Sequence, residues 1–146
     1  MIGVVGPDGP AARVAEGLDG AETAVGTAFD VVAASPDVVA AVGNASVSAL
    51  VQAGVAAPVL PVDTDEGFDS VPLDAATDAL ERALDGDLAA RTHPVLSVSI
   101  DGEAAGRACF DAMLVTSEPA RISEYAVETT DGTDQFRADG VGVTTP

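Results

Sequence analysis

Short apolar runs alternate with helix-like segments through the first half of the chain. The runs that predict buried strands are rich in Val and Ala and are bounded by turn residues; they cover residues 2–6, 24–29, 38–42 and 58–62. Segments with helical spacing or a glycine stop lie at residues 11–18, 46–52 and 74–84. Because strands that alternate with helices join as parallel strands through right-handed crossovers, this half predicts an α/β lobe.

The pattern changes near residue 90, where apolar and polar positions begin to alternate with a period of two. Residues 95–100 alternate in this way and run into the turn pair Asp101-Gly102. Further strands are predicted at residues 108–115, 122–127 and 135–143, with a second Asp-Gly turn at 131–132. We therefore predict an α/β lobe with parallel strands over residues 1–90 and a partial antiparallel β lobe over residues 91–146, with no flexible linker between them.

Charge changes this picture most. The 146 residues include 24 acidic and 6 basic ones, for a net charge of −18, and every basic residue is Arg. Disordered acidic chains are poor in Val, Leu and Ile, whereas this chain is rich in them. The composition instead predicts a carboxylate-covered globule adapted to molar salt, of the haloarchaeal type, because molar salt screens self-repulsion. A nucleic-acid partner is not expected, since no basic patch is present to neutralise phosphates.

The chain also lacks targeting and membrane signals. No run of 18 uncharged apolar residues occurs, and the N-terminus has no basic flank of the signal-peptide kind. We therefore expect a cytoplasmic protein with no membrane partner.

Few residues offer metal or nucleophile chemistry. Cys109 is the single cysteine, in an apolar context that favours a buried thiol, and His93 has no second His or Cys to form a metal site. The acidic residues 63–67 resemble half of a calcium loop, but the distal Glu is missing, so solvated loop acids are favoured over weak cation binding. A P-loop is excluded because the chain has no Lys. No metal ligand is predicted.

Two segments carry a resemblance to a known family. Residues 119–125 (Pro-Ala-Arg-Ile-Ser-Glu-Tyr) and 137–146 (Arg-Ala-Asp-Gly-Val-Gly-Val-Thr-Thr-Pro) are similar to an arginine-glycine-aspartate-glycine strand and its Ser-Thr-Pro exit. Residues 58–62, followed by Gly67-Phe68, are similar to a strand and glycine-phenylalanine turn. In order and local sequence, these pieces resemble the NAD kinase family, whose members phosphorylate the adenosine ribose 2′-hydroxyl of NAD. The resemblance covers nearly the whole chain but only the earlier part of a family member.

The family's diagnostic turn, Gly-Gly-Asp-Gly-Thr, corresponds to Val42-Gly43-Asn44-Ala45-Ser46. Such a turn brings backbone amides to phosphates and points a carboxylate at the reacting hydroxyl. Asn44 stands at the catalytic aspartate position, and an amide cannot act as the general base, whose assistance is typically worth about 10²–10⁴-fold. Gly43 and Ser46 would bind nucleotide by this resemblance. The alternative is that Gly43 serves turn geometry and Asn44 or Ser46 caps a helix.

The remaining site candidates follow from the same resemblance. The family's Asn-acid pair corresponds to Phe110-Asp111, where Phe110 is favoured as a core aromatic over a base-stacking one. Asp139 corresponds to a contact with the nicotinamide side of the dinucleotide, or is a solvated carboxylate at a strand end. The candidate cofactor-binding residues are Gly43, Ser46, Gly67, Phe68, Asp111, Asp139 and Thr145.

Two functions follow from these residues. The resemblance implies an ATP-dependent NAD kinase relative, impaired by Asn44, that uses NAD, ATP and Mg²⁺. The alternative is a non-catalytic nucleotide-binding or assembly module on a degenerate scaffold. The chain stops before the family's Gly-Ser-Thr-Ala-Tyr loop, as expected for either a degenerate relative or a fragment. A homo-oligomer is expected because family members bury the dinucleotide between subunits, and because the final strand would otherwise leave an open edge.

Overall fold

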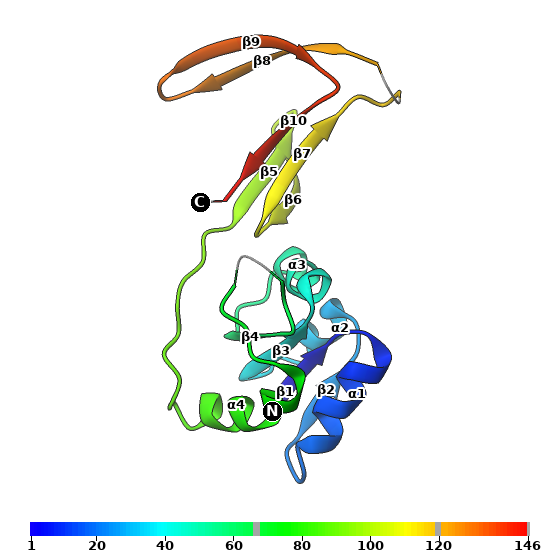
Figure 1. Ribbon diagram of the computed structural model, residues 1–146, viewed down its shortest axis with the longest axis vertical. Coiled ribbons are helices and arrows are strands. Elements are labelled where there is room, and N and C mark those ends of the chain that lie inside the picture. Colours follow the sequence, from blue (N-terminus) through cyan, green and yellow to red (C-terminus); the bar gives the residue numbers. More distant parts are fainter. Residues whose placement is uncertain (66–67, 119–120, 146) are drawn as a thin grey trace.

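A four-stranded parallel sheet forms the first half of the protein (Figure 1). The computed structural model describes residues 1–65, 68–118 and 121–145. The strand order is β2-β1-β3-β4. The strands are β1 (Ile2–Val5), β2 (Thr23–Val25), β3 (Val38–Val42) and β4 (Val59–Val62). The predicted α/β lobe with parallel strands is confirmed.

Helices cover both faces of this sheet. They are α1 (Asp8–Gly17), α2 (Ala28–Ala33), α3 (Asn44–Ala53) and α4 (Ala76–Leu84), the last preceded by the 3₁₀ turn η1 (Leu73–Ala75). One core cluster joins one face of β1 and β3 to α1 and α4, through residues such as Val4, Val14 and Leu80. The opposite face packs on α2 and α3, through Val39 and Leu50 among others. Successive strand residues point to opposite faces, so two-sided coverage explains the uninterrupted apolar runs in β1 and β3.

The predicted strand at residues 24–29 is wrong beyond its first two residues. Strand β2 ends at Val25, and α2 begins at Ala28. Thr27 caps this helix, because its hydroxyl oxygen accepts a hydrogen bond from the backbone N–H of Asp30 at 3.3 Å. The cap signal Thr-x-x-Asp was therefore present in the sequence and was masked by the apolar residues around it.

The second half consists of antiparallel two-stranded ribbons within residues 96–118 and 121–144. Strand β5 (Leu96–Ile100) pairs with β6 (Glu103–Ala108), β7 (Asp111–Val115) with β10 (Gly140–Thr144), and β8 (Ser123–Thr129) with β9 (Gly132–Ala138). The turn at Asp101-Gly102 is confirmed, with positive φ angles of 53° and 85° that a two-residue hairpin loop of type I′ requires. The predicted partial antiparallel β lobe is also confirmed.

Two strands differ from the sequence prediction. Residues 108–115 divide between the end of β6 and β7, and residues 135–143 divide between β9 and β10 at Asp139. Strand β6 escaped prediction because its sequence, Glu-Ala-Ala-Gly-Arg-Ala, has no alternating apolar pattern and is exposed along most of its length.

The two halves meet where β6 reaches α3. Cys109 is 3% exposed and belongs to the core cluster of α2 and α3, with Phe68 and Phe110 packed against it. An extended segment leads from α4 to β5 along one side of the α/β lobe (Figure 1). Across the described ranges, no helix has the length and apolar character needed to cross a membrane.

Candidate functional site

The parallel sheet has a topological switch point between β1 and β3. The chain leaves β1 through α1 toward β2, and leaves β3 through α3 toward β4, with the two helices in core clusters on opposite faces. In open α/β sheets, ligands bind outside the carboxyl ends of the strands at such a point. The loops that begin there start at Gly6 and Gly43. This is the position where the fold itself favours a ligand.

The geometry of the turns requires glycine at both positions. A Cβ atom on Gly6 would lie 2.7 Å from the Cβ of Val42, closer than side chains tolerate. Gly43 has a φ of +79°, and its N–H donates a hydrogen bond to the carbonyl of Val62 at 2.8 Å. The turn after β3 is therefore set by close approach and by positive φ, and Gly6 belongs to the site although sequence reasoning missed it.

The side chains of Asn44 and Ser46 point to different partners. The Oδ1 atom of Asn44 accepts a hydrogen bond from the backbone N–H of Asp65 at 3.0 Å, which ties α3 to the loop after β4. Ser46 is only 7% exposed, and its hydroxyl donates to the carbonyl of Val42 at 2.7 Å. Ser46 therefore holds the strand-turn-helix together from inside.

The amino end of α3 can attract an anion. This helix has ten residues and carries no acidic residue in its first turn. The N–H groups of Gly43 and Ser46 already donate to the carbonyls of Val62 and Gly43, so those of Asn44 and Ala45 are the ones that could meet an anion. Apart from Gly43 itself and its two chain neighbours, no heavy atom of the described residues lies within 4 Å of the Cβ position of Gly43.

The loop after β4 is organised by Asp63. Its φ is +46°, and its Oδ1 atom accepts a hydrogen bond from the backbone N–H of Leu73 at 3.1 Å. Asp63 thus fixes the start of η1. Within residues 1–65, 68–118 and 121–145, no three His, Cys, Asp or Glu side chains come together to hold a metal ion.

An aromatic group marks the junction between the two halves. The ring of Phe68 lies 4.5 Å from that of His93 and 5.0 Å from that of Phe110, in an edge-on arrangement with the latter. All three side chains are partly buried. Phe110 therefore packs as a core aromatic, and His93, for which the sequence predicted no role, packs with it.

Thr145 anchors the end of β10 to the same junction. Its hydroxyl donates to the carbonyl oxygens of Cys109 and Phe110, at 2.9 Å and 3.1 Å, and its N–H donates to that of Phe110 at 2.8 Å. Asp111 begins β7, pairs with Thr144 and is exposed. The structure thus brings Phe68, Asp111 and Thr145 to the junction, whereas Gly67 lies outside the described residues.

Asp139 lies at the other end of the β7–β10 ribbon. It lies six positions before Thr145 along extended chain, a span of about 20 Å at the usual strand rise. It lines a shallow groove of about 390 Å³ with Met113, Val115, Gly140 and Gly142 among others. Asp139 is therefore far from the junction within one chain.

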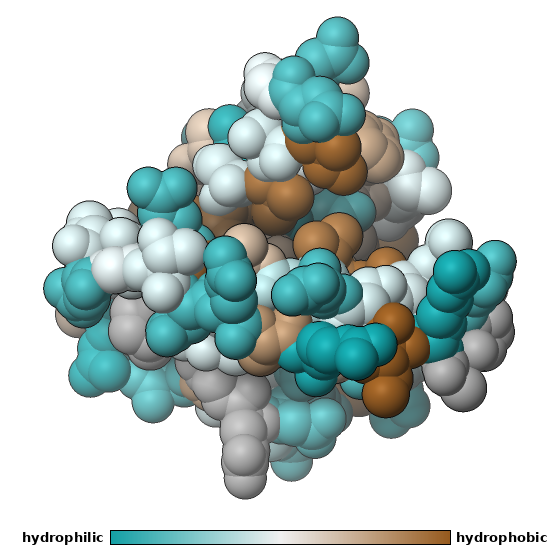
Figure 2. All heavy atoms as spheres, turned by 90° about the horizontal axis from the view of Figure 1, so that it is seen from above, coloured by the Kyte–Doolittle hydropathy of each residue, from teal (hydrophilic) through white to brown (hydrophobic). Residues whose placement is uncertain are grey.

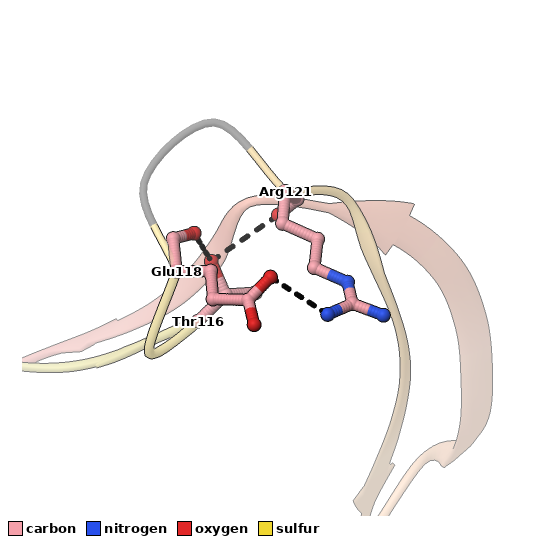
Figure 3. A network of polar contacts seen from close by, with 3 residues as sticks. All are labelled: Thr116, Glu118 and Arg121. Atoms are coloured by element: carbon pink, nitrogen blue, oxygen red, sulfur yellow. Dashed lines mark hydrogen bonds and ion pairs between the residues drawn. The ribbon is translucent and has the colours of Figure 1, made fainter.

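Thr116, which also lines this groove, takes part in polar contacts with Glu118 and Arg121 (Figure 3). The Thr116 hydroxyl lies 3.0 Å and 3.2 Å from the carbonyl oxygens of Glu118 and Arg121, and the Arg121 guanidinium pairs with the Glu118 carboxylate at 2.7 Å. The N–H of Thr116 donates to the carbonyl of Asp139 at 3.1 Å. These contacts connect the end of β7 to the turn that holds Asp139.

Comparison with known proteins supports the fold. No protein-family model and no curated protein matches the sequence. The structure is similar to the crystal structure of an NAD kinase from Archaeoglobus fulgidus in complex with ATP, with a TM-score of 0.70 and 18% sequence identity. The match covers 98% of this chain and 59% of that chain, so the protein spans somewhat more than half the length of this neighbour. At this identity the likeness establishes an NAD kinase-like fold, as the sequence predicted.

Proposed function

We propose that this chain is an NAD kinase-like nucleotide-binding protein in which ATP-dependent phosphorylation of the adenosine ribose 2′-hydroxyl of NAD is impaired. The observation that carries the proposal is the strand-turn-helix at Gly43 and Asn44, at the switch point of an NAD kinase-like sheet. The structural neighbour, solved with ATP, supports nucleotide binding on this scaffold.

Phosphate binding rests on the backbone of this turn. The amino end of α3 supplies N–H groups and a favourable dipole, and Gly43 leaves the approach open. The net charge of −18 opposes anion binding at low salt, so we expect binding to strengthen as salt screens the carboxylates. Mg²⁺ would accompany the phosphates, because in such sites it binds mainly through phosphate oxygens, waters and one or two carboxylates.

Impairment rests on the chemistry of Asn44. A side-chain amide has no basic lone pair at neutral pH, so it cannot take the proton of the attacking hydroxyl. Its oxygen is also engaged by the N–H of Asp65. A carboxylate at this position could accept the same hydrogen bond and keep a second oxygen for the substrate, which makes Asn44→Asp a conservative change.

The test measures NADP formation from NAD and ATP, or polyphosphate, in molar KCl. We expect the wild-type rate to lie near the blank, and Asn44→Asp to raise it by about 10²-fold or more. Asn44→Ala is the matched control, since it removes the amide without supplying a base. An active NAD kinase with an intact Gly-Gly-Asp-Gly-Thr turn verifies the assay. If Asn44→Asp folds and binds nucleotide but forms NADP no faster than the wild type, the kinase proposal is wrong.

A second candidate is a non-catalytic nucleotide-binding or assembly module. The engagement of Thr145 and Phe68 in packing at the junction favours it, because these side chains then serve the scaffold. Calorimetry with NAD, NADP and ATP separates the two functions from a purely structural role. Binding without NADP formation in either Asn44 variant would support the module, and silence for all three nucleotides would leave a structural role only.

We also propose that the protein works at molar salt as a homo-oligomer. The excess of carboxylates supports the first part, and the open strands of the β lobe support the second.

A further inference from the structure

A hollow between α1 and α4 lies on the α/β lobe. Its volume is about 540 Å³, larger than that of the groove beside Asp139 and within the range of about 300–1,000 Å³ that small-molecule sites occupy. The residues that line it come from α1, from the loop after β4 and from the start of η1 and α4: Arg13, Asp63, Pro72, Leu73, Asp74 and Thr77. The lining is therefore distinct from the candidate nucleotide turn at residues 43–46.

A close approach of the two helices borders this hollow. A Cβ atom on Gly17 would lie 2.5 Å from the hydroxyl oxygen of Thr77, so α1 has glycine where the first turn of α4 meets it. Arg13 precedes Gly17 by four positions and therefore lies on the same side of α1. Val14 and Leu80, both buried, fix the two helices on the sheet. The place of Arg13 at the hollow thus follows from how the helices pack.

The hollow is lined by three charged groups that are not paired with one another. Within the described ranges, the ion pairs are those of the N-terminal ammonium, Arg91 and Arg121, so Arg13 has no carboxylate partner within 4.0 Å. Asp63 uses Oδ1 to accept the N–H that starts η1, which leaves its second oxygen for another partner. Asp74 is exposed and lines the same hollow. One guanidinium and two carboxylates are therefore available to a ligand.

This charged lining distinguishes the hollow from the apolar surface of the β lobe. Figure 2 views the molecule from the β-lobe end and shows hydrophobic residues gathered among hydrophilic ones. Met113 and Val115, for example, are more than half exposed there. In the hollow between α1 and α4, by contrast, three of the six lining side chains are charged and Thr77 adds a hydroxyl. Such a lining selects a ligand by its charges rather than by its apolar surface.

The sign and number of the charges restrict the ligand. A simple anion would meet two carboxylates and a net charge of −18, and a nucleoside triphosphate remains anionic even with one Mg²⁺ bound. A bare metal ion would meet the Arg13 guanidinium, and within the part of the chain that the structure describes no third metal-ligating side chain joins the two carboxylates. A molecule with two cationic groups and one carboxylate offers an opposite charge to each group of the hollow.

We propose that this hollow binds a free amino acid with a basic side chain, such as lysine or ornithine. Arg13 holds the carboxylate of the ligand, since a guanidinium and a carboxylate pair through two parallel hydrogen bonds. Asp63 and Asp74 hold the α-ammonium and side-chain ammonium groups. The assignment uses no residue of the turn at residues 43–46, so it can be tested independently of the proposed function.

The experiment titrates L-lysine into the full chain in molar KCl, followed by calorimetry and by NMR shifts of the Arg13, Leu73 and Thr77 amides. We expect saturation at one lysine per chain. Norleucine lacks the side-chain ammonium and cadaverine lacks the carboxylate. Each should bind at least about tenfold more weakly than lysine, because each loses a hydrogen bond between charged groups.

Substitutions inside the hollow should weaken lysine binding. Arg13→Gln and Asp74→Asn each remove one charge and should raise the Kd for lysine at least about tenfold. Asp63→Asn should do the same, while its side-chain oxygen can still accept the backbone hydrogen bond that starts η1. Arg82→Gln and Asp78→Asn are the matched controls, because they change the net charge equally from exposed positions on α4 outside the hollow. Both should leave the Kd unchanged.

Three results would overturn the inference. One is a wild-type protein with a native circular dichroism spectrum that shows neither heat nor amide shifts with lysine. Another is lysine binding that norleucine or cadaverine equals, or that Arg13→Gln and Asp74→Asn leave unchanged. The third is binding of ATP with Mg²⁺ that displaces lysine and is lost in Arg13→Gln, since the hollow would then belong to the nucleotide.

Discussion

The side-chain oxygen of Asn44 lies 3.0 Å from the backbone nitrogen of Asp65 and accepts its hydrogen bond. This contact connects the first turn of α3 with the loop that follows β4, across 21 positions of sequence. The residue that the resemblance places at the catalytic aspartate position of NAD kinases therefore has a structural partner. Substitutions of Asn44 can therefore distinguish its contribution to stability from its contribution to catalysis.

Substitution of Asn44 should separate the two roles in a stability measurement. Asn44→Ala removes the acceptor and should lower the free energy of unfolding by about 1 kcal/mol, the usual net value of such a bond. Asn44→Asp keeps an oxygen at the same place and should cost less. Urea unfolding in molar KCl compares the two. Equal losses from both variants would show that the bond to Asp65 contributes nothing.

Gly6 should tolerate no side chain. In Gly6→Ala the new Cβ would lie 2.7 Å from the Cβ of Val42, and the required shift of β1 against β3 should cost about 1–3 kcal/mol. Gly106→Ala is the control, since among the described residues no heavy atom beyond Gly106 and its chain neighbours lies within 4 Å of its Cβ position, and a strand interior prefers Ala. Thermal unfolding of both variants tests this. A Gly6→Ala protein as stable as Gly106→Ala would contradict the close approach.

Thr145 should hold the end of β10 in place. Thr145→Val preserves the shape but removes both hydroxyl hydrogen bonds to the carbonyls of Cys109 and Phe110, so we expect a loss of about 1 kcal/mol. Faster hydrogen exchange at the Thr145 N–H, which donates to Phe110, reports the loosening directly. Thr144→Val, at an exposed neighbour, should leave this exchange rate unchanged.

Asp37 should contribute to the loss of folding stability at acid pH. A hydrogen bond from the N-terminal ammonium, 2.6 Å away, and the attraction between the two charges lower the pKa of the Asp37 carboxyl below its ordinary value of 3.8. A carboxyl whose pKa is lower in the folded state stabilises the protein above the unfolded pKa. This contribution is lost as pH falls through the folded pKa. An NMR titration should find the Asp37 midpoint below 3.8, and Asp37→Asn should flatten that part of the stability curve. A midpoint at or above 3.8 would contradict the ion pair.

Salt should stabilise the fold strongly. With 24 acidic residues against 6 basic ones, folding concentrates like charges, and screening at molar salt relieves this repulsion. The midpoint of thermal unfolding should rise continuously from low KCl to molar KCl. An uncharged osmolyte at equal osmolarity controls for effects other than screening. A midpoint that is independent of KCl would argue against the halophilic interpretation.

The sequence predicted the α/β lobe well because its signals are local. The apolar runs at residues 38–42 and 58–62 are bounded by turn residues, and the structure places β3 and β4 there. The helix prediction at residues 74–84 covers α4 and all of η1 but Leu73, since Leu80 repeats on one face with Ala76. The failure at α2 came from a short helix of six residues, whose apolar content resembles that of a strand.

The positions of the candidate residues in the fold could be predicted only in part. Gly43, Asn44 and Ser46 follow a strand, so their gathering at one turn follows from the chain itself. The separation of Asp139 from Thr145 by a whole strand could be read from the sequence only if the break between β9 and β10 were known. The contacts of Phe68 with His93 and Phe110 could not, because they join segments 25 and 42 positions apart that no local pattern relates.

The lobe architecture, the acidic composition and the presence of an amide at position 44 follow from the chain alone, because periodicity, composition and residue identity are properties of the sequence. Three features could be seen only in the folded chain: Asn44 bonds to Asp65, Ser46 faces inward, and the β ribbons leave apolar side chains exposed. These features depend on contacts between segments that are far apart in the sequence. Such contacts, rather than the local sequence pattern, determine which side chains are buried.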